Sequence, residues 1–261
     1  MLYLYIYVIY KMKSKAILFG INYVYTPSSR LRGCVNDVKN MGKYLTEIEN
    51  YDVVKIYTDE DDELKTRSHS IINKIYKLAL DSHRHKLKKV WIHFSGHGCG
   101  INDQSGDESD GKDECILPSD YQKSGVITDD LIKRVLRHFY KNTTVTCIFD
   151  CCHSGTIGDL KYVYKNDKSC PEKVNKLSKC QANVCLISGC MDNQTSADAY
   201  NVQGKRKFSG AMTSCLLMVL EKDKNIHKVI SNLRQLLKQK RYTQYPILSS
   251  SFIIPTNYSL Q

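Results

Sequence analysis

The sequence lacks the features that would divide it into several domains or carry it across a membrane. Its 261 residues contain no internal linker rich in proline, glycine or serine, and no repeat or low-complexity tract. The uncharged, tyrosine-rich stretch over residues 2–10 is much shorter than the roughly 20 apolar residues that span a bilayer. We therefore expect no membrane span and a single domain over residues 13–261. Residues 1–12 are expected to form a peripheral N-terminal extension, or Met12 to be the natural start.

Two further absences bear on the eleven cysteines. Because no secretory leader with a cleavage site is visible, we expect reduced thiols and a cytoplasmic location. The chain has no CxxC pair of the zinc-finger type, and a strand through Cys185 would turn its side chains to alternate faces. The regular spacing of Cys180, Cys185 and Cys190 therefore does not predict zinc. Thiols inside apolar runs, such as Cys147, Cys185 and Cys215, are predicted to pack as small hydrophobes.

The chain carries a formal net charge of +11, but it lacks the usual signs of a nucleic-acid-binding protein. The lysines and arginines are scattered over predicted helices and termini, without an RNP-like aromatic strand, zinc-finger spacing or a dense basic arm. The hypothesis that the chain is a nucleic-acid-associated protein thus depends on net charge alone. We expect a solvated basic surface and no nucleic-acid partner.

Acidic residues, in contrast, concentrate in one segment. Seven carboxylates lie between residues 103 and 120, where Lys112 is the only base. A cluster of this sign in a basic protein favours a hard cation as its partner. The alternative is that the segment is a solvated turn, and that Asp129 and Asp130 only begin a helix that Thr128 caps.

The hydrophobic pattern alternates between strands and helices along the chain. Runs rich in β-branched residues predict strands over 15–21, 52–58, 89–94, 143–149, 184–188 and 246–254, with a short extended segment at 115–118. Apolar residues at helical spacing predict helices over 36–48, 66–82, 129–139, 210–220 and 226–239. The lysine-rich segment 157–182 is expected to be a long mobile loop. This order predicts an α/β fold with a mainly parallel central β-sheet flanked by helices on both faces.

Two glycine-containing motifs follow predicted strands and contain the residues of a nucleophile–base pair. Residues 93–98 read His-Phe-Ser-Gly-His-Gly, and residues 149–155 read Phe-Asp-Cys-Cys-His-Ser-Gly. Open α/β sheets place their sites at the carboxyl ends of buried parallel strands, so His97 and Cys152 can meet there. A nearby imidazole lowers the pKa of a thiol and can later protonate a leaving amine. The backbone N–H groups of Gly98 and Cys152 are the candidate oxyanion hole, each worth roughly 3 kcal/mol in the transition state.

The sequence leaves alternatives open inside these motifs. Cys151 could be the nucleophile, but neighbouring residues of an extended segment face opposite sides, so only one of Cys151 and Cys152 should face the site. His153 could be the base, although an adjacent residue on a tight turn seldom reaches its neighbour's sulfur. His93 lies inside a predicted strand and is expected to be a core or supporting histidine.

Ordered blocks between residues 15 and 257 resemble the metacaspases, which are caspase-fold cysteine peptidases. The blocks are Gly-Ile-Asn-Tyr at 20–23, Leu-Arg-Gly-Cys-Val-Asn-Asp at 31–37, Ser-Gly-His-Gly at 95–98, the acidic loop at 106–114, Asp-Cys-Cys-His-Ser-Gly at 150–155, Ile-Ser-Gly-Cys at 187–190, Gln-Thr-Ser-Ala-Asp-Ala at 194–199 and Gly-Ala-Met at 210–212. The resemblance implies a caspase-like fold and a catalytic dyad of His97 and Cys152.

The resemblance also implies cleavage of polypeptide substrates after Arg or Lys. Four residues match the family's primary specificity pocket, namely Asp37, Asp150, Ser95 and Cys34. A guanidinium that enters a partly desolvated pocket needs a carboxylate, whereas an aspartate-directed caspase would need basic residues in the same place.

Activation by calcium (Ca2+) is a further implication of the resemblance. The family's calcium-binding positions fall on Asp113, Asp129, Asp130 and Asp159. Calcium takes about six to eight oxygen ligands, so backbone carbonyls and water would complete the shell. Binding near Asp159 would link the loop after Cys152 to the acidic loop.

The chain departs from the family pattern at Cys151, where the family usually has serine, and it has no proline-rich N-terminal region. It therefore resembles a compact type I metacaspase reduced to its catalytic domain, and we expect a monomer. Candidate self-cleavage sites are lysines of the segment 161–179, among them Lys161, Lys165 and Lys168.

The competing hypothesis is a catalytically silent caspase-fold scaffold that acts by protein binding. The presence of both His97 and Cys152 argues against that hypothesis.

Overall fold

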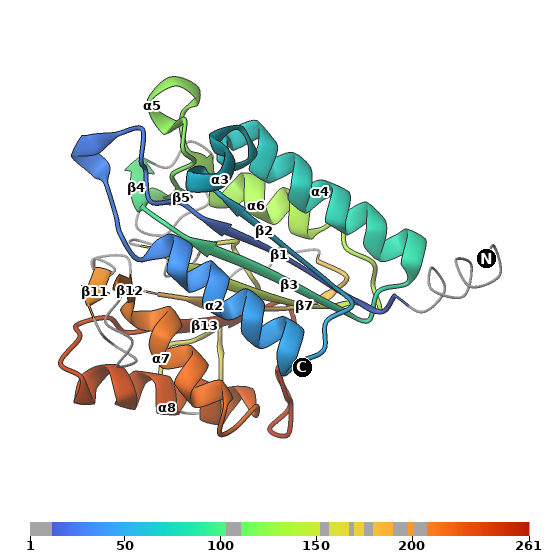
Figure 1. Ribbon diagram of the computed structural model, residues 1–261. Coiled ribbons are helices and arrows are strands. Elements are labelled where there is room, and N and C mark those ends of the chain that lie inside the picture. The colour runs from blue at the N-terminus through green and yellow to red at the C-terminus, as the bar shows by residue number, and fades with distance from the viewer. Residues whose placement is uncertain are drawn as a thin grey trace.

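The computed structural model describes residues 12–102, 111–151, 157–166, 170–174, 180–189, 198–200 and 208–260. These residues form an α/β fold around an eight-stranded sheet with the strand order β2-β1-β3-β7-β10-β13-β8-β9 (Figure 1). The fold class expected from the alternation of strands and helices is therefore confirmed.

Five neighbouring strands of this sheet run parallel, as their buried apolar runs predict. They are β2 (Val53–Thr58), β1 (Ser14–Gly20), β3 (Lys89–Ser95), β7 (Thr144–Asp150) and β10 (Asn183–Ser188). Antiparallel strands complete the sheet beyond β10, namely β13 (Ile247–Ser250), β8 (Tyr162–Tyr164) and β9 (Glu172–Lys173). Strands β3 and β7 end in register with Ser95 opposite Asp150, so both residues lie at the carboxyl edge of the sheet.

Helices cover both faces of the sheet (Figure 1). Helices α2 (Cys34–Glu47), α7 (Ala211–Leu220) and α8 (Ile226–Gln239) pack on one face, while α4 (Ser68–His85) and α6 (Asp129–Leu136) pack on the other. Four of these helices are amphipathic, whereas α7 has nine of its ten residues buried and packs against both α2 and α8. Within the described parts of the chain, none of the helices combines the length and the apolar character needed to cross a membrane.

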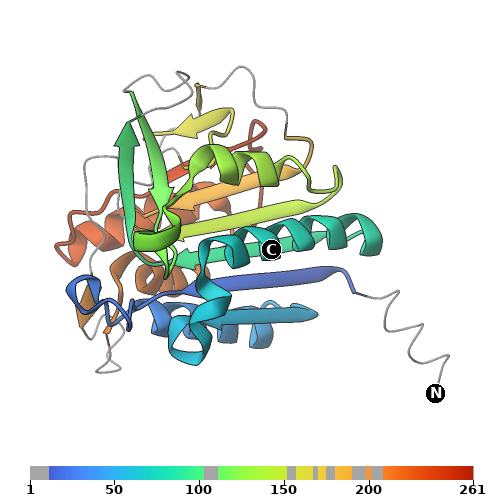
Figure 2. The ribbon, with the colours of Figure 1, turned by 90° about the horizontal axis from the view of Figure 1, so that it is seen from above.

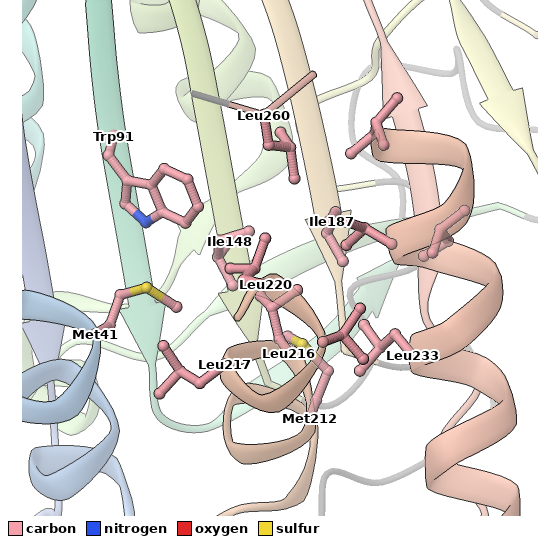
Figure 3. Close-up of a cluster of buried hydrophobic side chains, with 14 of the residues drawn as sticks. Met41, Trp91, Ile148, Ile187, Met212, Leu216, Leu217, Leu220, Leu233 and Leu260 are labelled. Atoms are coloured by element: carbon pink, nitrogen blue, oxygen red, sulfur yellow. The ribbon is translucent and has the colours of Figure 1, made fainter. Parts of the chain in front are cut away.

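The hydrophobic core on the α7 side joins this helix to the middle of the sheet. Figure 3 shows Trp91 of β3 and Ile148 of β7 beside Leu216 and Leu220 of α7. All four side chains are buried. Burial of one such large apolar side chain stabilises the fold by about 1.5–3 kcal/mol. This contact therefore holds α7 against strands β3 and β7.

A second, three-stranded sheet consists of β4 (Gly98–Asn102), β5 (Lys112–Ile116) and β6 (Ile127–Thr128). Figure 2 shows the β4–β5 hairpin, in green, standing at one end of the main sheet. The smaller elements are the helices α3 (Asp59–Asp62) and α5 (Tyr121–Ser124), the 3-10 turns Pro27–Ser29 and Glu63–Thr66, and the strand pair β11 (Asp198–Tyr200) and β12 (Phe208–Gly210).

The segment 157–182 differs from the loop that the sequence predicted. It contains β8 and β9, which extend the main sheet, and Val163 and Tyr164 are buried there. Strands of three and two residues are too short to produce a recognisable alternation among many lysines.

The cysteines of the apolar runs are buried, as predicted. Cys147 and Cys215 are 0% exposed and Cys185 is 1% exposed. Burial raises the pKa of Cys185 to about 12 and that of Cys215 to about 11, so both stay protonated thiols. Cys180 and Cys185 pack with hydrophobic clusters on opposite faces of the sheet, and Cys190 lies outside the described residues.

Candidate active site

The carboxyl edge of the parallel strands gathers several residues of the two motifs. Ser95 ends β3, Asp150 ends β7, and His97 follows β3 by two residues. Asp37 joins them from the first turn of α2, where its Oδ2 accepts a hydrogen bond of 2.8 Å from Ser95 Oγ. Cys152, the predicted nucleophile, lies outside the described residues, as do residues 153–156.

His97 is a half-buried residue whose ring has a hydrogen-bond partner among the described residues. Its Nε2 lies 2.8 Å from the carbonyl oxygen of Ser29. A carbonyl oxygen can only accept, so this partner assigns the proton of the neutral ring to Nε2 and leaves a lone pair on Nδ1. An imidazole in this tautomer can accept a proton at Nδ1.

Tyr23 holds the turn that carries His97. Its hydroxyl accepts from the His97 N–H at 2.8 Å and donates to the Leu117 carbonyl at 2.7 Å, and its ring centroid lies 4.7 Å from that of His97. Burial raises the pKa of Tyr23 well above its ordinary value, so the hydroxyl keeps the proton that it donates. Gly96 leaves the necessary room, because a Cβ at this position would lie 2.9 Å from the Tyr23 hydroxyl.

Gly98, a predicted oxyanion donor, begins β4. The Leu117 N–H donates to the His97 carbonyl at 3.0 Å, and Gly98 lies opposite Ile116 in the next pair of the ladder. Hydrogen-bonded and non-bonded pairs alternate in an antiparallel ladder, so the Gly98 N–H points away from β5. The hairpin therefore does not use this donor.

The start of α2 is capped from a neighbouring loop. Gly33 at the N-cap has no side chain, and Asn22 Oδ1 accepts from the N–H groups of Cys34 at 3.1 Å and Val35 at 3.4 Å. Asp37 lies in this turn, where the positive end of the helix favours a carboxylate. Cys34, a predicted pocket residue, is buried at 7% exposure in the same turn.

Asp37 and Asp150 meet at the start of α7. The Gly210 N–H donates to Oδ1 and Oδ2 of Asp37 at 2.8 and 2.9 Å. Thr213 donates to Asp150 Oδ2 from its backbone N–H at 2.9 Å and from Oγ1 at 2.8 Å. The two aspartates are only 1% and 3% exposed. Hydrogen bonds from fixed donors and the helix dipole stabilise their charged forms, so this edge can attract a cationic side chain.

Two residues left open by the sequence lie in the interior. Cys151 is completely buried in the cluster on the α4 and α6 face, where a substrate cannot reach its thiol. His93 is also completely buried, with Nε2 3.3 Å from Thr213 Oγ1, as expected of a supporting histidine. Burial lowers the pKa of His93 to about 3, so it is neutral at physiological pH.

The predicted calcium ligands lie close to a lysine. Lys133 Nζ is 2.8 Å from Asp159 Oδ2 and 3.6 Å from Asp130 Oδ1, and 10% of the lysine side chain is exposed. Asp129 Oδ2 accepts from the Glu114 N–H at 2.9 Å, which connects α6 to β5. A positive charge of the chain itself therefore lies among these carboxylates.

Asp113, Asp129, Asp130 and Asp159 form an acidic cluster, and their charges influence one another. Burial raises the pKa of Asp129 to about 6, and the charge of Asp159 adds to the rise. The hydrogen bond with Cys99 and burial raise the pKa of Cys115, and Asp129 and Asp113 raise it further. In the described ranges, however, no three His, Cys, Asp or Glu side chains converge in an arrangement that could hold a metal ion.

Several residues that hold this site were not assigned from the sequence. They are Tyr23, Ser29, Lys133, Gly210 and Thr213. Tyr23 and Gly210 belong to blocks that resemble the metacaspases, but the blocks do not say which partners the residues contact. Ser29 acts through its carbonyl oxygen, which carries no side-chain signal at all.

Comparison with protein families gives one match over more than half of the chain. The family model described as metacaspase, peptidase C14 domain, matches residues 14–161.

Similar proteins support this match, and a solved structure shares the fold. The chain is 32% identical to metacaspase-1 of Yarrowia lipolytica over 95% of its length and 63% of that protein. It is 34% identical to metacaspase-3 of Trypanosoma brucei brucei over 91% of its length and 71% of that protein. The chain thus spans about two thirds of these relatives. A crystal structure of a Geobacter sulfurreducens protein shares the fold, with a TM-score of 0.65, 24% identity and coverage of 95% and 97% of the two chains.

Proposed function

Because this chain belongs to the metacaspase family of cysteine peptidases, we propose that it is a calcium-activated endopeptidase that cleaves polypeptides after Arg or Lys. The observation that carries the proposal is the buried pair Asp37 and Asp150, at the sheet edge that also holds His97. A negative site of this kind attracts a cationic side chain and repels an acidic one. An aspartate-directed peptidase would need cations in the same place.

In the proposed reaction, His97 Nδ1 accepts the proton of the Cys152 thiol, and the sulfur attacks the carbonyl carbon of the scissile bond. The contact of Nε2 with the Ser29 carbonyl supports this division of roles between the two ring nitrogens. The imidazolium then protonates the leaving amine, and water hydrolyses the thioester. The N–H of Gly98, which points away from β5, and that of Cys152 would stabilise the oxyanion.

Asp113, Asp129, Asp130 and Asp159 are the proposed calcium ligands, and binding would have to bring their side chains together, because no three of them converge in the described part of the chain. Their carboxylate oxygens are the donors that a hard divalent cation prefers. When bound, the ion would supply two positive charges where the Lys133 ammonium supplies one. Since Lys133 pairs with both Asp159 and Asp130, it competes with any cation that these two carboxylates would hold.

Self-processing in the segment 161–179 is a separate part of the proposal. Lys165 is exposed and pairs with Glu172 Oε2 at 3.0 Å, while Lys161 lies directly before β8 and Lys168 is outside the described residues. The intact mass of the wild type after addition of calcium should show two fragments, and Cys152→Ala should keep its full mass. Cleavage of the Cys152→Ala variant at the same rate would contradict self-processing.

A cytoplasmic monomer is the proposed state of the protein. Caspases pair through a sheet edge, whereas strand β9 at one edge of this sheet has only two residues, Glu172 and Lys173, both exposed. Short charged edge strands disfavour pairing with another chain. Light scattering should give the mass of one chain, and a dimer mass would refute the monomer. Fractionation of the native cells should place the protein in the cytoplasm.

Matched peptides test the specificity and the activation directly. Three peptides that differ only in Arg, Lys or Asp before the scissile bond are incubated with the protein, in calcium and in chelator. We expect cleavage of the Arg and Lys peptides in calcium and none of the Asp peptide. Cleavage after Asp would overturn the specificity, and equal rates in chelator would overturn calcium activation.

Cys152→Ala is the control for this experiment and should abolish turnover. If the wild type cleaves none of the peptides while its thiols are shown to be reduced, the scaffold hypothesis replaces the peptidase. Salt-sensitive affinity in filter binding would instead support a nucleic-acid partner.

A further inference from the structure

The first turn of α7 supplies four hydrogen bonds to the two buried aspartates. Gly210 donates to both oxygens of Asp37, and Thr213 donates twice to Asp150 Oδ2. The aspartates come from α2 and β7, which are distant from α7 in the sequence. This turn therefore helps to orient the two carboxylates relative to each other, together with Ser95 Oγ, which also donates to Asp37 Oδ2.

Glycine is needed at position 210 because neighbouring atoms leave no room for a side chain, and not because of the backbone conformation. Its φ of −62° and ψ of 136° are values that any residue adopts. A Cβ at this position would lie 2.7 Å from Asp37 Oδ2 and still closer to Asp150 Oδ2. Both carboxylates thus occupy the room that a side chain would need, and their Oδ2 atoms lie close together beside Gly210.

The hydroxyl of Thr213 has a defined direction. Its single proton goes to Asp150 Oδ2, so toward His93 Nε2, 3.3 Å away, it presents a lone pair. His93 is neutral because burial lowers its pKa to about 3, and Nε2 is then the ring nitrogen that carries the proton. The hydrogen bonds that join His93, Thr213 and Asp150 therefore orient the Thr213 hydroxyl proton toward the Asp150 carboxylate.

We propose that Thr213 and Gly210 are positioning residues that set the preference for Arg over Lys before the scissile bond. The inference rests on the proposed function, in which Asp37 and Asp150 receive the substrate cation. Two donors on Oδ2 fix the plane of the Asp150 carboxylate and with it the direction of Oδ1. A planar guanidinium needs oxygens at fixed places, whereas an ammonium accepts many arrangements. Loss of a donor therefore weakens Arg substrates more than Lys substrates.

Thr213→Val tests this role, because it removes the Oγ1 donor and keeps the branched shape and the backbone N–H. For the Arg peptide we expect KM to rise about tenfold while kcat stays within about twofold, and for the Lys peptide KM should rise only about twofold. The preference for Arg over Lys then falls about fivefold. Thr213→Ser keeps the donor and should restore the wild-type preference.

Thr143→Val is the matched control. Thr143 is also completely buried and donates one side-chain hydrogen bond, of 2.8 Å, to the Leu87 carbonyl, but it lies before the amino end of β7. This variant should lower the melting temperature and leave the Arg over Lys preference unchanged.

Gly210→Ala is a second test that does not depend on Thr213. Since alanine suits the backbone there, a rise in KM for the Arg peptide reports the crowding of the carboxylates.

The outcomes separate this inference from the proposed function. If the wild type cleaves after neither Arg nor Lys, both fail. If the wild type cleaves the Arg peptide and Thr213→Val keeps the wild-type preference, only the positioning role is overturned. The same holds if Thr143→Val shifts the preference equally, or if Thr213→Val lowers kcat for both peptides alike without a change in KM. If Thr213→Val does not fold, an unchanged KM in Gly210→Ala overturns the role.

Discussion

Lys133 places a positive charge of the chain itself among the four predicted calcium ligands. Its ammonium contacts Asp159 and Asp130 and is mostly buried, so an incoming divalent ion meets both competition and repulsion. The proposed activation by calcium is therefore expected to depend on this side chain as much as on the carboxylates.

Lys133→Met is expected to bind calcium about tenfold more tightly than the wild type, because the ion no longer displaces a like charge. Isothermal titration calorimetry of the uncleaved Cys152→Ala background measures this affinity without any turnover. Lys43→Met removes an exposed lysine that pairs with Glu47 on α2, and it should leave the calcium affinity unchanged. An equal or weaker affinity in Lys133→Met would show that the lysine does not compete.

Cys151 and Cys152 are adjacent in sequence, but the buried thiol of Cys151 belongs to the core. Cys151→Ala is expected to cost about 1 kcal/mol of unfolding free energy and to leave kcat unchanged. Urea unfolding and the Arg peptide assay check the two quantities. Loss of all turnover in a folded Cys151→Ala variant would mean that the nucleophile had been assigned to the wrong residue.

At the scale of single residues, the sequence indicated which side chains belong to the site better than it indicated which residues they contact. Asp37, Ser95 and Asp150 were named as one group, and the structure brings them to one sheet edge. Lys133 could not be found in this way, because a lysine one turn into a helix is usually solvated and only the fold turns this one inward.

Among the elements, α2 depends on a residue outside itself. Asn22 caps this helix, and the capped turn carries Asp37. Asn22→Ala is therefore expected to lower the unfolding free energy by about 1 kcal/mol and to raise KM for the Arg peptide. Both are measured on the same preparation, by urea unfolding and by steady-state kinetics.

Asn225→Ala is the matched control for this change. Asn225 caps α8, where its Oδ1 accepts from the Lys228 N–H at 3.2 Å, and α8 carries no residue of the candidate site. The variant should lose a similar amount of stability and keep the wild-type KM. A rise in KM in both variants would attribute the effect to general loosening and not to the position of Asp37.

Long elements were predicted well because their periodicity extends over several turns or pairs. The helix expected over 226–239 is observed as α8 with the same bounds, and β10 starts one residue earlier than expected. The hairpin β4–β5 was recognised only as an extended segment, since Gly98 and Gly100 interrupt any alternation in β4. Strands as short as β8 and β9 depend on tertiary pairing, which a local pattern does not contain.

For the whole molecule, the lowered pKa of His93 predicts that the folded state loses stability in acid. The folded chain protonates His93 only near pH 3, whereas the unfolded chain does so near its ordinary pKa of 6.5. Below pH 6.5 the unfolded state therefore binds a proton that the folded state lacks, and the unfolding free energy falls. This residue contributes up to about 1.4 kcal/mol for each pH unit between these two values.

Urea unfolding between pH 7 and pH 4 tests this dependence. His93→Gln cannot titrate but can still donate to Thr213 Oγ1, so its stability should decline less steeply with falling pH than that of the wild type. A decline of the same slope in both proteins would mean that other groups account for the acid sensitivity.

The strand order explains why the sequence could predict the location of the site but not its full composition. Parallel strands β3 and β7 are neighbours, so their carboxyl ends had to coincide. Nothing in the local pattern near residue 210 indicates that α7 would return to this edge. Its position follows from packing between α2 and α8, which is a property of the complete fold.

The late place of Gly210 and Thr213 in the chain affects how the protein is made. Translation produces Asp37, His97 and Asp150 long before the turn that orients the two acids. A nascent chain that has left the ribosome only as far as residue 200 lacks the donors that Gly210 and Thr213 supply to the two acids. The proposed recognition of a basic substrate therefore requires that the chain has been made and folded at least as far as Thr213.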